Sequence, residues 1–244
     1  MSAKLKTHFA PAERSGKAEI ARQVRDVSSS SLVSGLLETA AGLLAVLNRR
    51  RQILALNHAL LAALRVRDPE AVLGLRPGEA IRCVHARDMA AGCGTGKFCA
   101  SCGAAIAIVS SLKKRRPVDQ KCILTVAGGG ETRDLCFRVK AHPFRVRKEP
   151  FLLLFLQDIS EEERRAELER AFFHDLKNVV MGIQGASQLM AKGTGAGMAD
   201  WPQQIGRMAS RLQAEIAIQQ SLSRGTPGRY APRIEAIRAG DLLA

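Results

Sequence analysis

The pattern of apolar and polar residues predicts short elements over the first two thirds of the chain. Two apolar runs flank a polar turn and predict a β-hairpin, and segments at helical spacing come next. A longer helix and three strands then follow, with glycines turning the first strand into the second. In chain order these elements span residues 43–48, 52–57, 58–66, 69–74, 77–83, 103–114, 121–127, 133–142 and 151–157.

From residue 161 the pattern changes to that of long helices. An acidic start is followed by a stripe of apolar residues at helical spacing, which predicts one buried face. The stripe consists of Leu168, Phe172, Leu176, Val179, Val180 and Ile183. Glycines at 192–198 break this helix, and a second helix is predicted from Asp200 to about residue 223. One helical hairpin buries its stripe poorly, so we expect two chains to pair into a four-helix bundle.

Composition narrows the class of protein. The 244 residues include 46% hydrophobic and 25% charged residues, as in a globular protein, and the apolar runs are too short to span a membrane. The N-terminus lacks the apolar core of a signal peptide, so we expect a cytoplasmic location. The net charge of +14 is spread along the chain, and the sequence has only one Tyr and one Trp, so it offers no set of aromatic residues for stacking on bases. Nucleic acid is therefore not an expected partner.

The candidate chemistry of the long helix lies at His174, Asp175, Leu176, Lys177 and Asn178. His174 and Asn178 are four residues apart and share a helix face, with Asp175 one step round. This pentapeptide resembles the phosphoacceptor box of bacterial sensor histidine kinases. The resemblance implies that His174 accepts phosphate, that Asp175 acts as acid or base on the imidazole, and that Asn178 positions the water for dephosphorylation. Val179 stands where that family often has a proline.

The order of elements before this helix, a hairpin, short helices, one longer helix and three strands, resembles a PAS domain. The closing Asp158-Ile159-Ser160 resembles the element from which many PAS domains lead into a signalling helix. We therefore predict an α+β protein with a five-stranded antiparallel sheet, its helices packed on one face, followed by the dimeric helical hairpin. The predicted parts are a flexible basic arm (1–31), a PAS-like sensor domain (32–160), a signalling helix with phosphoacceptor hairpin (161–223) and a tail (224–244).

Four cysteines cluster within the predicted sensor domain. Cys83, Cys93, Cys99 and Cys102 fall within 20 residues, and His85 follows the first of them by two. Cys99 and Cys102 have the spacing of a metal-binding knuckle, and the glycines around them let the backbone wrap closely around a ligand. In a cytosolic protein such a cluster indicates metal or redox ligands more than disulfides.

Three interpretations of this cluster remain open. The cysteines are ordinary small residues, or they bind structural zinc as four thiolates or as three with His85, or four thiolates hold an iron–sulfur cluster. The resemblance to a sensor domain favours the iron–sulfur cluster, because a change in its redox state, or its loss, would give a signal. Cys122 and Cys136 fall on predicted strands and are expected in the core.

Together these features predict a two-component signalling module, in which redox or metal sensing controls a phosphorelay from His174 to a response regulator. The ATP-binding domain of a histidine kinase would begin near residue 224, and only 21 residues remain. We therefore expect no self-phosphorylation without a separate kinase domain. Two rivals stay open: a non-enzymatic redox or metal sensor that uses the hairpin only to dimerise, and, ranked last, a basic nucleic-acid regulator with a zinc knuckle.

Overall fold

The computed structural model describes residues 5–128, 130–191 and 200–224, and it divides into two compact units, Met1–Glu163 and Arg164–Ala244. The glycine-rich break at 192–198 and the tail beyond 224 lie outside the described residues. The elements are α1 (Lys17–Ser28), α2 (Ser31–Thr39), β1 (Leu43–Leu47), β2 (Ile53–Leu56), α3 (His58–Leu64), η1 (Pro69–Ala71), α4 (Pro77–Ala80), η2 (Val84–Arg87), η3 (Phe98–Ala100), α5 (Gly103–Lys114), β3 (Val118–Gly128), β4 (Glu131–Val146), β5 (Glu149–Asp158), α6 (Ser160–Ala191) and α7 (Trp201–Arg224).

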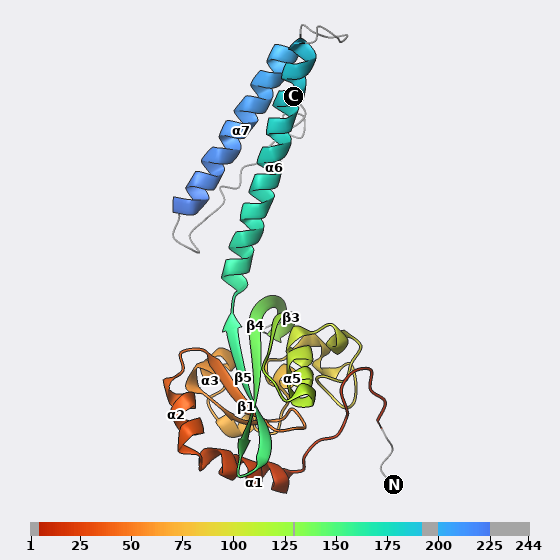
Figure 1. Cartoon of the computed structure of the whole chain (residues 1–244), viewed down its shortest axis with the longest axis vertical. Coiled ribbons are helices and arrows are strands. Elements are labelled where there is room, and N and C mark those ends of the chain that lie inside the picture. The colour runs from red at the N-terminus through yellow and green to blue at the C-terminus, as the bar shows by residue number, and fades with distance from the viewer. Residues whose placement is uncertain (1–4, 129, 192–199, 225–244) are drawn as a thin grey trace. The chain divides into compact units, whose positions relative to one another are not determined.

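The first unit is built on one five-stranded antiparallel sheet with the strand order β2-β1-β5-β4-β3 (Figure 1). The last strand, β5, lies in the centre and pairs with both β1 and β4. The fold class predicted from the sequence is confirmed: an α+β domain of PAS-like architecture, followed by a helical hairpin. The central position of β5 matters for function, because the chain passes directly from this strand into α6.

One face of the sheet carries the main core. Successive strand residues point to opposite faces, so the inward residues of β1, β4 and β5 form one apolar layer. Helices α3 and α5 cover this layer with residues such as Leu60 and Ile108, and α5 lies beside β3 and β4. Cys122 and Cys136 are buried, as the sequence predicted.

The opposite face is covered as well, which differs from the expectation of helices on one face only. Val46, Leu54 and Phe151 form a second apolar cluster, and Ile20 and Val24 of α1 pack against it. Residues 1–31 were expected to be a flexible arm with about one turn of helix near 18–27, but α1 has 12 residues. Helix α1 forms because its apolar residues recur at helical spacing and are buried. This stripe is short and lies among many charged residues, but its burial outweighs the polar composition of the segment.

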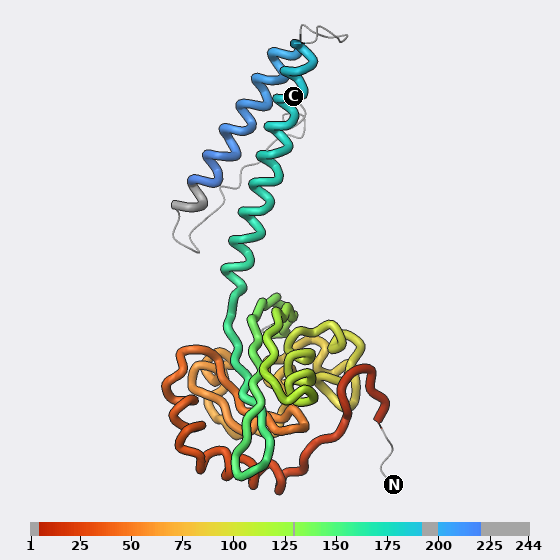
Figure 2. Tube along the Cα trace, viewed as in Figure 1, coloured from red at the N-terminus to blue at the C-terminus, as the bar shows by residue number. Residues whose placement is uncertain are grey.

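Polar contacts fix α1 at the hairpin between β4 and β5 (Figure 1). Arg22 and Gln23 both donate hydrogen bonds to Glu149, and Arg147 pairs with Asp26 at 2.9 Å. The hydrogen bond from Arg22 is the main cause that lowers the pKa of the Glu149 carboxyl. The N-terminal segment before α1 runs beside the cysteine-bearing loops (Figure 2), where the His8 amide donates to the Thr95 carbonyl.

The start of α6 is tied to the sheet by the closing element of the domain. The Asp158 carboxylate accepts a hydrogen bond from the amide of Ser160, the first residue of α6. Cys136 of β4 donates its amide to the Ser160 hydroxyl and accepts a hydrogen bond from the Ile159 amide. Further along, Lys121 of β3 forms a 2.5 Å ion pair with Glu163 in the first turn of α6. The first turn of α6 is therefore attached to both β3 and β4.

The second unit is the helical hairpin. Within it α6 and α7 pack closely where Gly182 meets Met208, since a side chain at position 182 would overlap the Met208 sulfur. The predicted stripe on α6 is confirmed except at its first residue, Leu168, which is exposed: Val179 is buried, and Phe172, Leu176, Val180 and Ile183 are half-buried. Several apolar side chains of α6 remain exposed, among them Leu168, Phe173 and Met181. In the part of the chain that is described, no helix combines the length and the hydropathy that crossing a membrane requires.

Candidate functional site

The three residues of the predicted phosphoacceptor box lie together on α6. The Nδ1 atom of His174 is 3.2 Å from Asp175 Oδ1 and 3.3 Å from Asn178 Nδ2. The two contacts need opposite tautomers, because the carboxylate accepts from an N–H whereas the amide donates to a lone pair. When Nδ1–H donates to Asp175, the lone pair lies on Nε2, which is then available as a nucleophile. The His174 side chain is 72% exposed, so a macromolecular partner can reach it.

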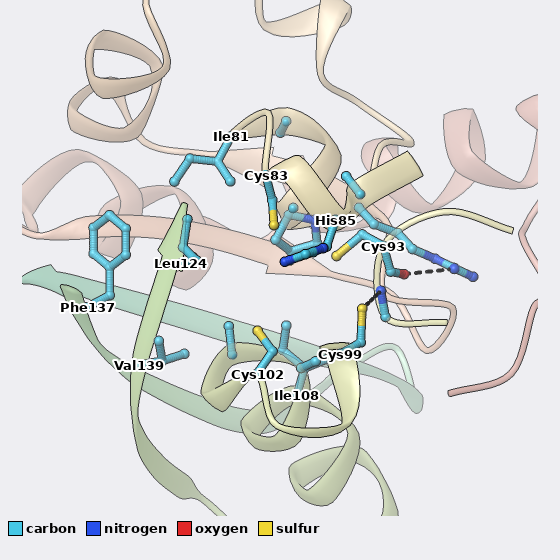
Figure 3. Close-up of a pocket in the computed structure, with 18 of the residues that line it drawn as sticks. Ile81, Cys83, His85, Cys93, Cys99, Cys102, Ile108, Leu124, Phe137 and Val139 are labelled. Atoms are coloured by element: carbon cyan, nitrogen blue, oxygen red, sulfur yellow. Dashed lines mark hydrogen bonds between the residues drawn. The ribbon is translucent and has the colours of Figure 1, made fainter. Parts of the chain in front are cut away.

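The cysteine cluster lies around one cavity between the sheet and the loops before α5 (Figure 3). Cys83, Cys93, Cys99, Cys102 and His85 all line it, as the sequence grouped them. The cavity has a volume of about 310 Å³. Its remaining wall is mostly apolar and includes Ile108 of α5, with Phe137 and Val139 of β4 at the end away from most of the cysteines. The structure thus brings five predicted ligands to one place.

The loop before α5 holds the thiols close to backbone. Cys99 is buried, and the Gly94 amide donates to its sulfur at 3.3 Å. A side chain at Gly78 would come within 2.5 Å of the Cys93 sulfur. Burial raises the pKa of Cys93 to about 12, and negative charge on Cys99 adds to this; burial also raises the pKa of Cys83. Without a cation between them, these two thiols therefore stay protonated at neutral pH.

Cys102 has a different environment, because it caps the N-terminus of α5. Its sulfur lies 3.7 Å from the sulfur of Cys122 on β3. The hydrogen bond with Cys122 is the main cause that lowers the pKa of Cys102 to about 6, and the amides of Ala104 and Ala105 contribute. The same contact raises the pKa of Cys122. Sequence reasoning placed Cys122 in the core and missed its contact with the cluster.

His85 is oriented by two neighbours. Its Nδ1 atom is 2.8 Å from Asp88 Oδ2, and its ring stacks on Phe98 with centroids 4.0 Å apart. A histidine whose Nδ1–H donates to a carboxylate presents the Nε2 lone pair to the other side, which is how metal-binding histidines are commonly held. When Nδ1–H of His85 donates to Asp88, the lone pair of its ring lies on Nε2.

The arrangement of donor atoms bears on the kind of metal centre. Among the described residues, no group of three His, Cys, Asp or Glu side chains is close enough to hold a single ion. A structural zinc ion needs four ligands within bonding distance of one point. An iron–sulfur cluster is larger, so its cysteines stand farther apart around a cavity.

Two buried arginines adjoin the cysteines, and sequence reasoning missed both. Arg76 is fully buried and donates to five backbone carbonyls, those of Ala12, Glu13, Arg50, Ala91 and Cys93. It therefore ties the N-terminal segment to the cysteine loop. Arg51 is only 6% exposed, and its Nε has no hydrogen-bond partner in the described part of the chain. Burial lowers the pKa of both guanidinium groups, to about 10 for Arg76.

The close approach of α5 to β3 depends on Gly103. A Cβ atom at this position would overlap the Lys121 carbonyl oxygen. We expect Gly103→Ala to lower the free energy of unfolding by about 1–3 kcal/mol, because strand or helix must shift. Gly35→Ala in α2 is the matched control, since nothing lies within 4 Å of its Cβ position. Urea unfolding of both variants measures the difference, and equal stabilities would contradict this packing.

Comparisons with known proteins give weak likenesses. The sequence matches no family model and no curated protein. Among solved structures, the PAS domain of nitrogen regulation protein NR(II) from Vibrio parahaemolyticus is similar over 53% of this chain and 100% of its own, with 15% identity and a TM-score of 0.39. The PAS domain of Bordetella pertussis BvgS has 21% identity over 60% of this chain and 95% of its own, with a TM-score of 0.37. The Rhodobacter sphaeroides LOV protein covers 86% of this chain and 100% of its own, with 13% identity and a TM-score of 0.39.

Proposed function

We propose that this chain is a sensor module of two-component type, in which a PAS-like domain controls a phosphoacceptor at His174. The observation that carries the proposal is the geometry at His174 Nδ1. With Asp175 holding the proton on Nδ1, an exposed imidazole offers Nε2 for phosphoryl transfer. Asn178, 3.3 Å away on the same face, would position the water for the reverse hydrolysis.

The sensing part of the proposal is a metal centre in the cysteine cavity. Cys83, Cys93, Cys99 and Cys102 would hold an iron–sulfur cluster, with His85 as the alternative ligand that a zinc ion would use. Four thiolates give such a centre a net negative charge. The buried guanidinium of Arg51, beside Gly94 with an unpartnered Nε, supplies a compensating charge. A cluster would supply electron transfer, or loss of the metal on oxidation, as the signal.

The structure of the first unit suggests how such a signal reaches α6. Cys102 at the start of α5 contacts Cys122 of β3, and β3 and β4 together hold the first turn of α6. A change in the cavity that moves α5 or β3 would alter these attachments. Helix α6 continues from there to His174. The proposed partners are a second copy of the chain, whose hairpin would cover exposed residues such as Phe173 and Met181, and the receiver domain of a response regulator.

Labelled ATP tests the proposed dependence on a second protein. We expect the purified 244-residue chain to incorporate no label alone, because its sequence supplies no Asn-rich or Gly-rich nucleotide-binding box. Addition of a separate histidine-kinase catalytic domain should label the wild type and leave His174→Gln unlabelled. Label on the isolated chain would contradict the dependence, and equal label on His174→Gln would contradict the assignment of the acceptor.

A second candidate is a redox or metal sensor that uses the hairpin only to dimerise. The exposed apolar side chains of α6 favour it as much as they favour the relay, since both need a dimer. The two differ in the effect of single substitutions. A pure dimerisation role predicts that His174→Gln has no effect on signalling whereas Cys99→Ser does, and the relay predicts that both are defective.

A further inference from the structure

A pair of thiols at the edge of the cysteine cavity has a geometry that a metal site alone does not explain. The sulfurs of Cys102 and Cys122 are 3.7 Å apart, which is van der Waals contact, and both cysteines are free. They come from different elements: Cys102 is the N-cap residue of α5, and Cys122 lies on β3, a strand at the edge of the sheet. Cys122 was expected to be an inert core residue, yet it faces a thiol that lines the cavity.

The backbone holds this pair in register. Gly103, next to Cys102, lies so close to β3 that a Cβ would overlap the carbonyl oxygen of Lys121, the residue next to Cys122. The position of the two sulfurs thus depends on a direct backbone contact beside them and not on the rotamers of long side chains. The sulfur–sulfur distance in a disulfide is about 2.05 Å, so bond formation requires a movement of less than 2 Å, of the size that side-chain rotation gives.

We propose that Cys102 and Cys122 form a reversible disulfide when a hydroperoxide reaches metal-free protein. Cys102 reacts first, because it is half-buried at the cavity wall whereas Cys122 is only 1% exposed. Its sulfur attacks one peroxide oxygen, the O–O bond breaks, and the thiol proton leaves with the other oxygen as water, giving a sulfenic acid. The Cys122 sulfur then attacks the Cys102 sulfur, the S–O bond breaks, and the second thiol proton leaves with that oxygen as a second water. Two thiols lose two electrons and one hydrogen peroxide becomes two waters.

The position of the bond gives it a structural consequence. Cys122 follows Lys121, whose ammonium group lies 2.5 Å from Glu163 in the first turn of α6. A disulfide would fix the start of α5 to β3 at the residue next to this ion pair. The oxidised pair would thus act on the same end of α6 as the proposed metal centre, and a metal bound at Cys102 would protect the pair from oxidation.

Peptide mapping of oxidised full-length protein tests the inference. The protein is stripped of metal with a chelator under anaerobic conditions, treated with hydrogen peroxide, alkylated, and digested with trypsin. Cleavage after Lys97, Lys113, Lys121 and Arg133 places Cys102 in residues 98–113 and Cys122 in 122–133. We expect these two peptides to be linked in most chains, with the link lost on addition of dithiothreitol. Fragmentation distinguishes Cys102 from Cys99, which lies in the same peptide.

Two variants make the result specific. Cys136→Ser removes another buried strand cysteine and should leave the link unchanged, whereas Cys122→Ser should abolish it and leave Cys102 open to further oxidation. Cys122 recovered as a free, alkylated thiol in peroxide-treated wild type would overturn the inference, as would linkage of Cys102 to Cys83, Cys93 or Cys99. The result does not depend on the metal proposal: protein that never contained metal should form the same link.

Discussion

Wild-type protein purified without oxygen is expected to be brown, to absorb at about 400 nm and to contain about two to four iron atoms per chain, as a cluster held by four thiolates would. Cys99→Ser should lower the iron content about tenfold or more. The reason is that Cys99 is buried, lines the cavity with three other thiols, and receives a hydrogen bond from the Gly94 amide. An alcohol in that position does not replace a thiolate as an iron ligand. Iron analysis and the visible spectrum measure the effect.

The control for this experiment is Cys136→Ser. Cys136 is similarly buried but lies on β4 outside the cavity wall, so its replacement should leave iron and colour unchanged. Iron that is unchanged in Cys99→Ser would contradict the site. A colourless preparation with one zinc ion per chain would replace the cluster with structural zinc, and a colourless metal-free preparation would remove the metal from the sensing proposal.

Much of the fold could be predicted because its signals are local. The β1–β2 hairpin, the helix α5 and the three long strands follow from short apolar runs and glycine turns, and each lies within a few residues of its predicted bounds. Helix α1 was predicted too short, as about one turn near 18–27, because its stripe of Ile20, Val24 and Val27 is short and lies among charged residues. The sheet face that buries this stripe is formed by residues about 20 to 130 positions away in the sequence. A local sequence pattern therefore does not predict that the stripe is buried.

The candidate sites also differ in whether their residues are close together in the sequence. His174, Asp175 and Asn178 are neighbours on one helix, so their spacing alone predicts that they meet. The five candidate ligands that line the cavity also lie within 20 residues and could be grouped from sequence. Arg51, Arg76 and Cys122 could not, because their roles depend on the three-dimensional path of the chain. Arg51 and Arg76 are both buried beside the cysteine loop, and Cys122 meets Cys102 only through the packing of α5 on β3.

His174→Gln is expected to abolish phosphoryl acceptance by the hairpin. Glutamine keeps the helix and a side chain of similar length, but it has no nucleophilic nitrogen lone pair. The chain supplies its own comparison, because His8, His58 and His142 are also exposed. Exposure alone would therefore label all four histidines to a similar extent. Among these four, in the described part of the chain, only His174 has a carboxylate at its Nδ1, and the tautomer that donates Nδ1–H to Asp175 makes Nε2 the reactive atom.

The most direct measurement is the site of phosphate in full-length protein treated with phosphoramidate, a small phosphoryl donor that needs no kinase domain. Phosphohistidine is mapped by mass spectrometry at neutral pH, and a receiver domain is then added to follow transfer. We predict phosphate on His174 at about tenfold or more above the other exposed histidines, its absence in His174→Gln, and its passage to the receiver aspartate. Phosphate spread evenly over His8, His58, His142 and His174, or retained when the receiver is added, would contradict a phosphorelay through His174.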